Sequence, residues 1–120
     1  MKKTEAIKLN REFRSLYYRG GSMASRSLVI YYRKNKRSIN RLGLTVSKKI
    51  GKAVVRNHIK RLIKENYRLR EDNIKTGYDI IFVARRACPS KTFHEIGRDM
   101  DYVLGKCGLF LSEKDNPETD

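Results

Sequence analysis

The sequence predicts a single domain of the α+β class. Its 120 residues suffice for one compact domain with a modest core. Residues 27–33, 41–47 and 78–84 have the apolar, β-branched and aromatic composition of strands, and three other segments have helical periodicity. The longest helical pattern lies between the second and third of these strands, so the order of elements predicts a β-α-β unit.

The first half of the chain predicts one helix and two strands. Asn10 is expected to cap the helix, which ends at Gly20–Gly21. Positions i, i+3 and i+4 place three apolar residues on one face of that helix: Phe13, Leu16 and Tyr17. Strand 41–47 alternates, with Leu42, Leu44 and Val46 on one face. A polar, basic turn separates it from strand 27–33, and this spacing predicts that the two strands form a hairpin.

The second half predicts two helices, one strand and a tail. A helix is expected over residues 53–71 and an apolar strand over residues 78–84. Ser90 is expected to cap the last helix. The apolar stripe of that helix comprises Phe93, Ile96, Met100, Val103 and Leu104. Residues 112–120 are polar and acidic, which predicts a disordered tail after a domain formed by residues 1–111.

The charge of the chain points to a polyanionic partner. Lys and Arg number 28 against 13 Asp and Glu, a formal net charge of +15. Repulsion at this level opposes compaction, so the charge is expected to serve a partner such as nucleic acid. An acidic membrane surface is the alternative, but no segment has the pattern of an interfacial anchor and no apolar run approaches about 18 residues.

The compartment predicted for the chain is the cytoplasm. The basic N-terminus has no apolar segment behind it, so no secretory signal is expected. In a reducing compartment Cys88 and Cys107 should stay free, and their number and spacing fit no zinc motif. Both are interpreted as small apolar side chains.

The segment from Lys48 to Arg70 holds nine basic residues and a single acidic one, Glu65. On a helical wheel, an arc of roughly 140° collects Arg56, Asn57, Lys60, Arg61, Lys64 and Arg68. The opposite side carries Val55, Ile59, Leu62, Ile63 and Asn66. The helix is therefore expected to bury one stripe and to present a rigid basic stripe.

A solvated surface is the alternative for this stripe. Solvated faces usually mix charges of both signs, whereas Lys52, Arg56, Lys60 and Lys64 follow one another at i, i+4 and repel. The pattern favours a bound polyanion, whose phosphates suit the planar arginine fork. Asn57 can donate and accept, and so could reach a base edge or a 2′-hydroxyl.

Aromatic residues predict a second binding surface. Phe13 and Tyr17 share a helical face, and Ser27, Val29, Tyr31 and Arg33 share a strand face by period two. If these faces meet, they line an aromatic groove edged by cations, of the kind that binds single strands by stacking. The candidate lining residues are Phe13, Arg14, Tyr17, Val29, Tyr31 and Arg33. The alternative is that the aromatics belong to the core, as expected for Tyr32 on the opposite face.

No catalytic or metal site is predicted in the chain. A protein nuclease needs clustered carboxylates or a histidine pair. Asp79 is isolated on a strand, and Asp99 and Asp101 face different ways on the last helix. His58 and His94 lie far apart in sequence and in no recognised motif.

Several segments together resemble the bacterial ribonuclease P protein family. The run Ala53-Val54-Val55-Arg56-Asn57-His58-Ile59-Lys60-Arg61-Leu62-Ile63-Lys64-Glu65 is similar to that family's signature helix, and residues 42–52 to the strand and loop before it. Phe13, Tyr17, Gly20 and the strands at residues 26–31 and 77–85 also match, so the resemblance covers about residues 7–108. His58 departs from the family, which usually has Arg there.

This resemblance implies a fold and a function. The fold would be a four-stranded sheet with three helices and a β-α-β crossover of the rare left-handed sense, against the general right-handed rule. The partners would be a catalytic RNA subunit and precursor tRNA, with no obligatory protein partner. The RNA subunit would cleave the 5′ leader endonucleolytically with bound Mg²⁺, and the protein would bind no cofactor of its own.

In the resemblance, the basic helix and its approach hold the RNA subunit through Lys48, Lys49, Lys52, Arg56, Asn57, His58, Lys60, Arg61, Lys64 and Arg68. The resemblance also implies that the protein holds the leader in a cleft between the first helix and the sheet, where the aromatic groove is predicted. Two other functions fit parts of the sequence. A ribosomal or general RNA-binding protein or chaperone would explain the charge, and a stand-alone metal-dependent nuclease is the second alternative.

Overall fold

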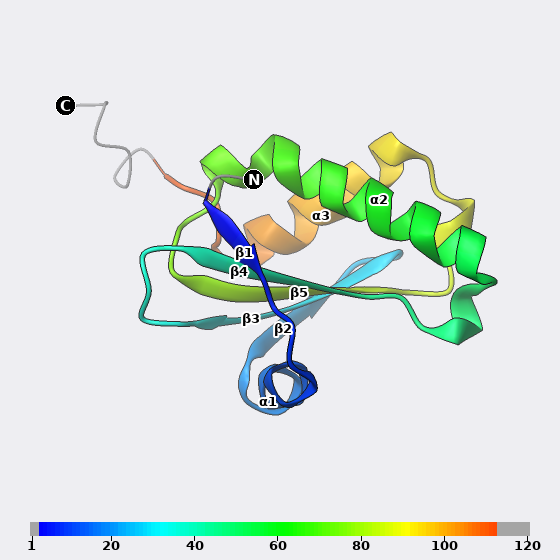
Figure 1. Cartoon of the computed structure of the whole chain (residues 1–120). Helices are drawn as coiled ribbons and strands as arrows, with labels where there is room; N and C mark the ends of the chain where they lie inside the picture. Colours follow the sequence, from blue (N-terminus) through cyan, green and yellow to red (C-terminus); the bar gives the residue numbers. More distant parts are fainter. Residues whose placement is uncertain (1–2, 113–120) are drawn as a thin grey trace.

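The computed structural model describes residues 3–112, which form three layers around one mixed β-sheet (Figure 1). The strands are β1 (Thr4–Ala6), β2 (Gly21–Ala24), β3 (Leu28–Lys34), β4 (Asn40–Thr45) and β5 (Tyr78–Ala84). The helices are α1 (Asn10–Arg19), α2 (Ala53–Arg70) and α3 (Phe93–Lys106), and short 3₁₀ turns span Lys48–Ile50, Glu71–Asn73 and Cys88–Ser90. Helices α2 and α3 cover one face of the sheet, and α1 packs on the other. The α+β class with three helices is thereby confirmed.

The strand order is β1-β4-β5-β3-β2. Strand β4 runs parallel to both β1 and β5, whereas β3 runs antiparallel to β5 and β2. The predicted β-α-β unit is present as β4-α2-β5. The predicted hairpin between residues 27–33 and 41–47 is wrong, because β5 lies between them. Strand β5 is almost wholly apolar and Ile80, Ile81 and Phe82 are fully buried, so it suits the central position, where both faces are covered.

The sheet has five strands rather than the four that the resemblance implies. Strand β1 pairs with residues 40–42 of β4, and β2 pairs with residues 29–32 of β3. Both are short and carry no alternating apolar pattern. Thr4 is instead fixed by its hydroxyl, which donates to Glu71 Oε2 at 2.5 Å and lies 2.9 Å from the Tyr67 hydroxyl. The handedness of the β4-α2-β5 crossover stays a prediction.

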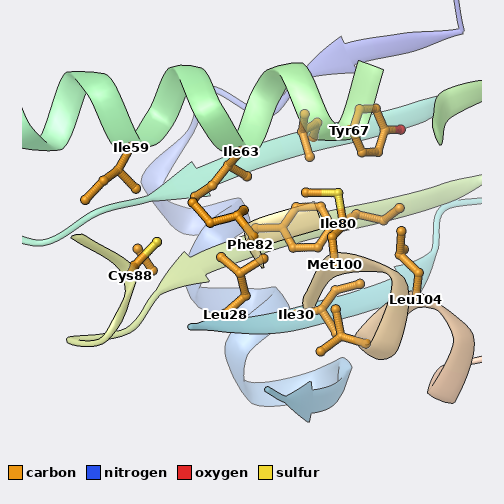
Figure 2. Packing of buried hydrophobic residues seen from close by; sticks show 14 of the residues in the cluster. Leu28, Ile30, Ile59, Ile63, Tyr67, Ile80, Phe82, Cys88, Met100 and Leu104 are labelled. Carbon is orange, nitrogen blue, oxygen red and sulfur yellow. The ribbon is translucent and has the colours of Figure 1, made fainter. Parts of the chain in front are cut away.

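The main core lies between the sheet and helices α2 and α3 (Figure 2). Strands contribute Leu28, Ile30, Ile80 and Phe82, helix α2 contributes Ile59, Ile63 and Tyr67, and helix α3 contributes Ile96, Met100, Val103 and Leu104. Burying each of these large side chains stabilises the fold by about 1.5–3 kcal/mol. The predicted stripe of α3 is confirmed, with Phe93 half-buried at its edge. Of the inward face predicted for α2, Ile59, Ile63 and Asn66 are buried and Leu62 is half-buried, but Val55 is exposed.

A smaller cluster lies between α1 and the other face of the sheet. Leu16, Ile7 and Ile81 are buried there, and Phe13, Tyr17, Tyr31 and Val83 pack against them half-buried. Cys88 is buried in the main core and Cys107 is half-buried, so both pack as small apolar side chains. Burial raises the pKa of the Cys88 thiol to about 11, which makes it a poor nucleophile.

Both predicted helix caps are wrong. Asn10 is already helical, and Leu9 precedes it with extended backbone and no side-chain cap. Ser90 belongs to a 3₁₀ turn and its hydroxyl donates to the Ala87 carbonyl. Helix α3 begins after Thr92, where a capping box with Glu95 satisfies two backbone N–H groups at once. The predicted acidic tail lies, from residue 113 on, outside the described residues.

Candidate RNA interface

Helix α2 carries the basic surface that the sequence predicts. The basic arc and the approach to the helix consist of Lys48, Lys49, Lys52, Arg56, Asn57, His58, Lys60, Arg61, Lys64 and Arg68, here named the α2 face. All are exposed except Arg56, which is half-buried because its Nε donates to the Gly51 carbonyl at 3.1 Å. The exposure of the predicted arc is therefore confirmed for all its residues but Arg56, and its contacts with RNA stay a prediction.

The electrostatics of the N-terminal end of α2 favour an anion. Lys52 precedes the helix with extended backbone and no side-chain cap, and the first turn has no acidic residue. The free N–H groups there carry the positive end of the helix dipole. Lys48, Lys49 and Lys52 add positive charge at the same end. This accumulation is unfavourable in the isolated protein, and a phosphate bound at this end would relieve it.

Two basic residues near the C-terminal end of α2 are partly committed within the protein. Arg68 forms an ion pair with Glu65, with a 3.0 Å bond from its Nε. This contact lowers the pKa of the Glu65 carboxyl. Arg70 bonds Asp101 of α3 and the side chain of Asn66, so it joins the two helices. The charge available to a partner is thus concentrated in the first three turns.

Two asparagines of helix α2 differ in their surroundings, one on the α2 face and one on the buried side. Asn57 is exposed, and its side chain forms no hydrogen bond within residues 3–112. In contrast, Asn66 on the buried side donates to the carbonyls of Leu62 and Phe93. His58 is exposed, with its Nδ1 3.4 Å from Arg61 Nη2. Asn57 is therefore available to a partner, whereas Asn66 is structural.

A groove of about 640 Å³ opens between α1 and the edge of β4. It is lined by Asn10, Phe13, Arg14, Tyr17, Leu44, Thr45, Val46 and Lys60. Strand β1 pairs with β4 only as far as Leu42, so the edge of β4 beyond that residue has no neighbouring strand among the described residues. A smaller hollow of about 280 Å³ includes Phe13, Lys60 and Lys64. Lys60 of the α2 face thus lines both the groove and the hollow, whereas Lys64 lines only the hollow.

The predicted groove residues separate into two sets. Phe13, Arg14 and Tyr17 line the groove, as the sequence predicts. Tyr31 lies behind Tyr17, their ring centroids 4.8 Å apart with the planes at 70°, and Val29 is half-buried. Arg33 donates to Ser15 Oγ at 3.0 Å, on α1. The sequence predicts that the face of α1 and this face of β3 line one groove, but α1 packs directly across β3 and β5.

Sequence reasoning missed the contribution of β4. Thr45 lies 2.8 Å from the Tyr17 hydroxyl through its Oγ1, and this bond fixes the phenol at the wall of the groove. Gly43 is buried below Phe13, and a Cβ placed there would lie 2.7 Å from the Phe13 ring. A glycine inside a strand can mark such a close approach, so Gly43 was the signal available in the sequence.

An ion-pair network holds α1 against the sheet beside the groove. Arg41 of β4 contacts Glu12 of α1 and, at 3.5 Å, Asp79 of β5. Its hydrogen bond lowers the pKa of the Glu12 carboxyl. Asp79 also accepts from Asn35 Nδ2 at 3.0 Å. Removal of Glu12 or Arg41 should therefore loosen the attachment of α1.

The acidic residues considered for a nuclease site all have structural partners. Asp79 contacts Arg41, Asp101 contacts Arg70, and Asp99 accepts from the Ser27 backbone at 3.0 Å. Across residues 3–112, no group of three or more His, Cys, Asp or Glu side chains could hold a metal ion. Within the same range, no helix is long and apolar enough to cross a membrane.

A basic helix next to a groove with aromatic walls, on a small α+β domain, defines a nucleic-acid-binding protein. A family model described as "Ribonuclease P" matches residues 1–108. The ribonuclease P protein component of Clostridium kluyveri is 49% identical over 106 residues, which cover 87% of this chain and 95% of that protein.

Two solved structures are similar to this chain in both fold and sequence. The Staphylococcus aureus RNase P protein superposes with a TM-score of 0.82 at 39% identity, covering 88% of this chain and 97% of that one. The Thermotoga maritima RNase P protein superposes with a TM-score of 0.78 at 29% identity, covering 85% and 96%. The chain belongs to the ribonuclease P protein family, whose members are subunits of the endoribonuclease that matures tRNA 5′ ends.

Proposed function

We propose that this chain binds the RNA subunit of ribonuclease P through the α2 face. The observation that carries the proposal is the concentration of cations on one exposed helical face opposed only by Glu65. Such a face binds RNA mainly by neutralising phosphates and releasing counterions. Asn57 adds a neutral donor and acceptor among the cations, suited to a base edge or a 2′-hydroxyl.

The groove between α1 and β4 is proposed to hold the single-stranded leader of precursor tRNA. Phe13 and Tyr17 supply aromatic surfaces, and Arg14 and Lys60 supply positive charge at its walls. Stacking on aromatic rings accepts any base, which suits leaders of varied sequence. The position of Lys60 in this groove supports a leader path that runs beside the RNA subunit.

The catalytic centre is proposed to lie in the RNA subunit, with Mg²⁺ bound there and no cofactor held by the protein. The protein would then act in the cytoplasm by positioning the leader and the RNA. The left-handed sense of the crossover belongs to the same proposal, since it rests on the family.

A cleavage assay separates this function from its alternatives. Precursor tRNA is incubated at limiting Mg²⁺ in three separate reactions. They contain the protein alone, the RNA subunit alone, or both together. The proposal expects leader removal to be strong only with both. Cleavage by the protein alone would identify a stand-alone nuclease, and the absence of any effect on the RNA subunit would favour a ribosomal or general RNA-binding role.

A further inference from the structure

A second charged groove, of about 720 Å³, lies along α3. It is lined by Ala24, Ser25, Arg26, Arg85, Arg98, Asp99 and Tyr102, and is here named the α3 groove. A neighbouring hollow of about 310 Å³ shares Arg26, Arg98 and Asp99 and adds Lys91 and Glu95. No residue of the α2 face, or of the groove between α1 and β4 (the α1 groove), takes part in either.

The carboxylates of this region are committed to neutral donors. Asp99 Oδ2 accepts from both the backbone N–H and the hydroxyl of Ser27. Glu95 Oε1 accepts from the Thr92 backbone N–H at 2.9 Å in the capping box. The bonds with Thr92 lower the pKa of Glu95, and the charges of Lys91 and Arg98 contribute less. Neither carboxylate forms an ion pair with a cation within residues 3–112.

The arginines are correspondingly available. Arg26 and Arg98 are exposed and have no ion-pair partner in the described part of the chain. Arg85 uses one nitrogen, Nη1, to donate to the Ser25 carbonyl at 2.7 Å, which holds its guanidinium at the groove. Three guanidinium groups around one concave surface suit a phosphate group, because each guanidinium can donate two parallel hydrogen bonds to its oxygens.

An aromatic ring completes the surface. Tyr102 is 50% exposed on the outer side of α3, and Lys106 Nζ lies 5.8 Å from its ring centroid. Exposed phenol beside unpaired arginines is the combination that binds a nucleic-acid strand through stacking and phosphate contacts.

The position of the α3 groove separates it from the α2 face. Helix α3 packs over β3 and β2, whereas α2 packs over β4, and β2 and β1 form opposite edges of the sheet. Lys60 and Lys64 of α2 reach the β1–β4 edge, and the α3 groove lies at the β2 edge. Helices α2 and α3 nevertheless cover the same sheet face, and α1 lies on the opposite face (Figure 1).

We propose that the α3 groove binds a second segment of the RNA subunit's phosphodiester backbone, apart from the segment held by the α2 face. This inference rests on the proposed function, since it assumes that α2 holds the RNA subunit. The shared sheet face favours this RNA over the precursor leader. The protein would then hold two parts of the RNA at opposite edges of its sheet, and both contacts would contribute to affinity.

The test compares two doubly substituted proteins. Arg26→Gln with Arg98→Gln removes two cations from the α3 groove, and Lys34→Gln with Lys36→Gln removes two exposed cations at the C-terminal end of β3 and in the turn after it. Binding to the RNA subunit is measured across a salt series, with hydroxyl-radical footprinting of the RNA. Each lost phosphate contact should lower the salt slope by about 1, so the groove variant should lose between about 1 and 2 and bind about tenfold more weakly. Its footprint should lose one set of protections while those that depend on α2 persist.

Three outcomes would contradict the proposal. A groove variant with the wild-type slope and footprint would show that the groove holds no RNA. An equal loss of RNA affinity in the Lys34 and Lys36 variant would show that the effect depends on net charge alone and not on the groove. A loss confined to precursor binding by the assembled enzyme would assign the groove to the substrate. Failure of the proposed function would differ from these, because wild-type protein itself would not bind the RNA subunit.

Discussion

At the residue scale, some side chains are available to a partner, whereas similar side chains nearby stabilise the fold. Asn57 and Asn66 lie on the same helix, yet one is exposed without a partner in residues 3–112 and the other joins α2 to α3 through two carbonyls. Tyr17 and Tyr31 likewise touch, but only Tyr17 lines the α1 groove. Substitutions at such pairs distinguish an effect on RNA from an effect on the protein.

Asn57→Ala should weaken binding to the RNA subunit by about 1–3 kcal/mol, the cost of leaving a polar group at the interface unpaired. The unfolding midpoint should not change, because Asn57 has no partner in the described structure. Asn66→Ala is the matched control and should lower the midpoint instead. A lower midpoint for Asn57→Ala with unchanged RNA affinity would assign Asn57 a structural role.

His58→Arg restores the residue usual in the family. It adds a cation to the α2 face and should tighten binding to the RNA subunit slightly. The gain should be small because His58 adjoins Arg61, so the two cations would repel at i, i+3. The measurement is RNA affinity at fixed salt, and weaker binding would reveal a role for the imidazole.

Tyr17→Ala should weaken precursor tRNA binding up to about a hundredfold, since stacking is worth roughly 1–3 kcal/mol per base. Phe13→Ala should act in the same direction, and Tyr31→Ala should act through the Tyr17 ring that it supports. Binding of precursor and mature tRNA to the reconstituted enzyme is compared at fixed salt. Equal losses for both ligands would mean that the aromatics do not hold the leader.

At the element scale, the attachment of α1 to the sheet sets the width of its groove. Gly43 lets Phe13 lie directly on the sheet, and Arg41 holds Glu12 beside it. Gly43→Ala should therefore destabilise the domain by about 1–3 kcal/mol through overpacking and displace Phe13. The midpoint of thermal unfolding should fall, and the affinity for precursor tRNA should decrease. Unchanged precursor affinity would show that the groove tolerates movement of α1.

The contact between Glu12 and Arg41 predicts a pH dependence. The pKa of Glu12 is lowered in the folded state, so its stabilisation is present above the unfolded value and is lost as pH falls through the folded pKa. The difference in free energy of unfolding between wild type and Glu12→Gln should thus shrink progressively as pH falls below about 4.3, the usual pKa of glutamate. A constant difference would exclude an ionic contribution from this pair.

Elements with strong local patterns could be predicted from the sequence, whereas their arrangement could not. Strand 78–84 matches β5 and helix 53–71 matches α2 within a residue, because each has a long, consistent pattern. Strands β1 and β2 were missed because neither has an apolar alternation. The order of strands depends on contacts between residues far apart in sequence, which local patterns do not reveal. The predicted hairpin placed β4 beside β3, so the sequence did not predict that β4 lines the groove.

At the scale of the whole molecule, the formal net charge of +15 is the property that bears most on binding, although some cations, such as Arg41, also hold the fold together. The core consists of apolar residues from all three layers, and most of the cations lie outside it. Charge of this kind makes affinity for RNA strongly dependent on salt. If six or more phosphate contacts form, affinity should fall about a thousandfold or more between low and elevated salt.

The central claim is that the α2 face holds the RNA subunit, and the most direct measurement is RNA binding by a charge-reversed face. Lys60→Glu with Arg61→Glu leaves Arg56 and its bond to Gly51 in place, and Lys34→Glu with Lys36→Glu reverses two cations elsewhere. Both variants should keep the wild-type unfolding midpoint. The account predicts that the first variant fails to assemble with the RNA subunit while the second assembles nearly normally. Normal assembly by the first variant would contradict it.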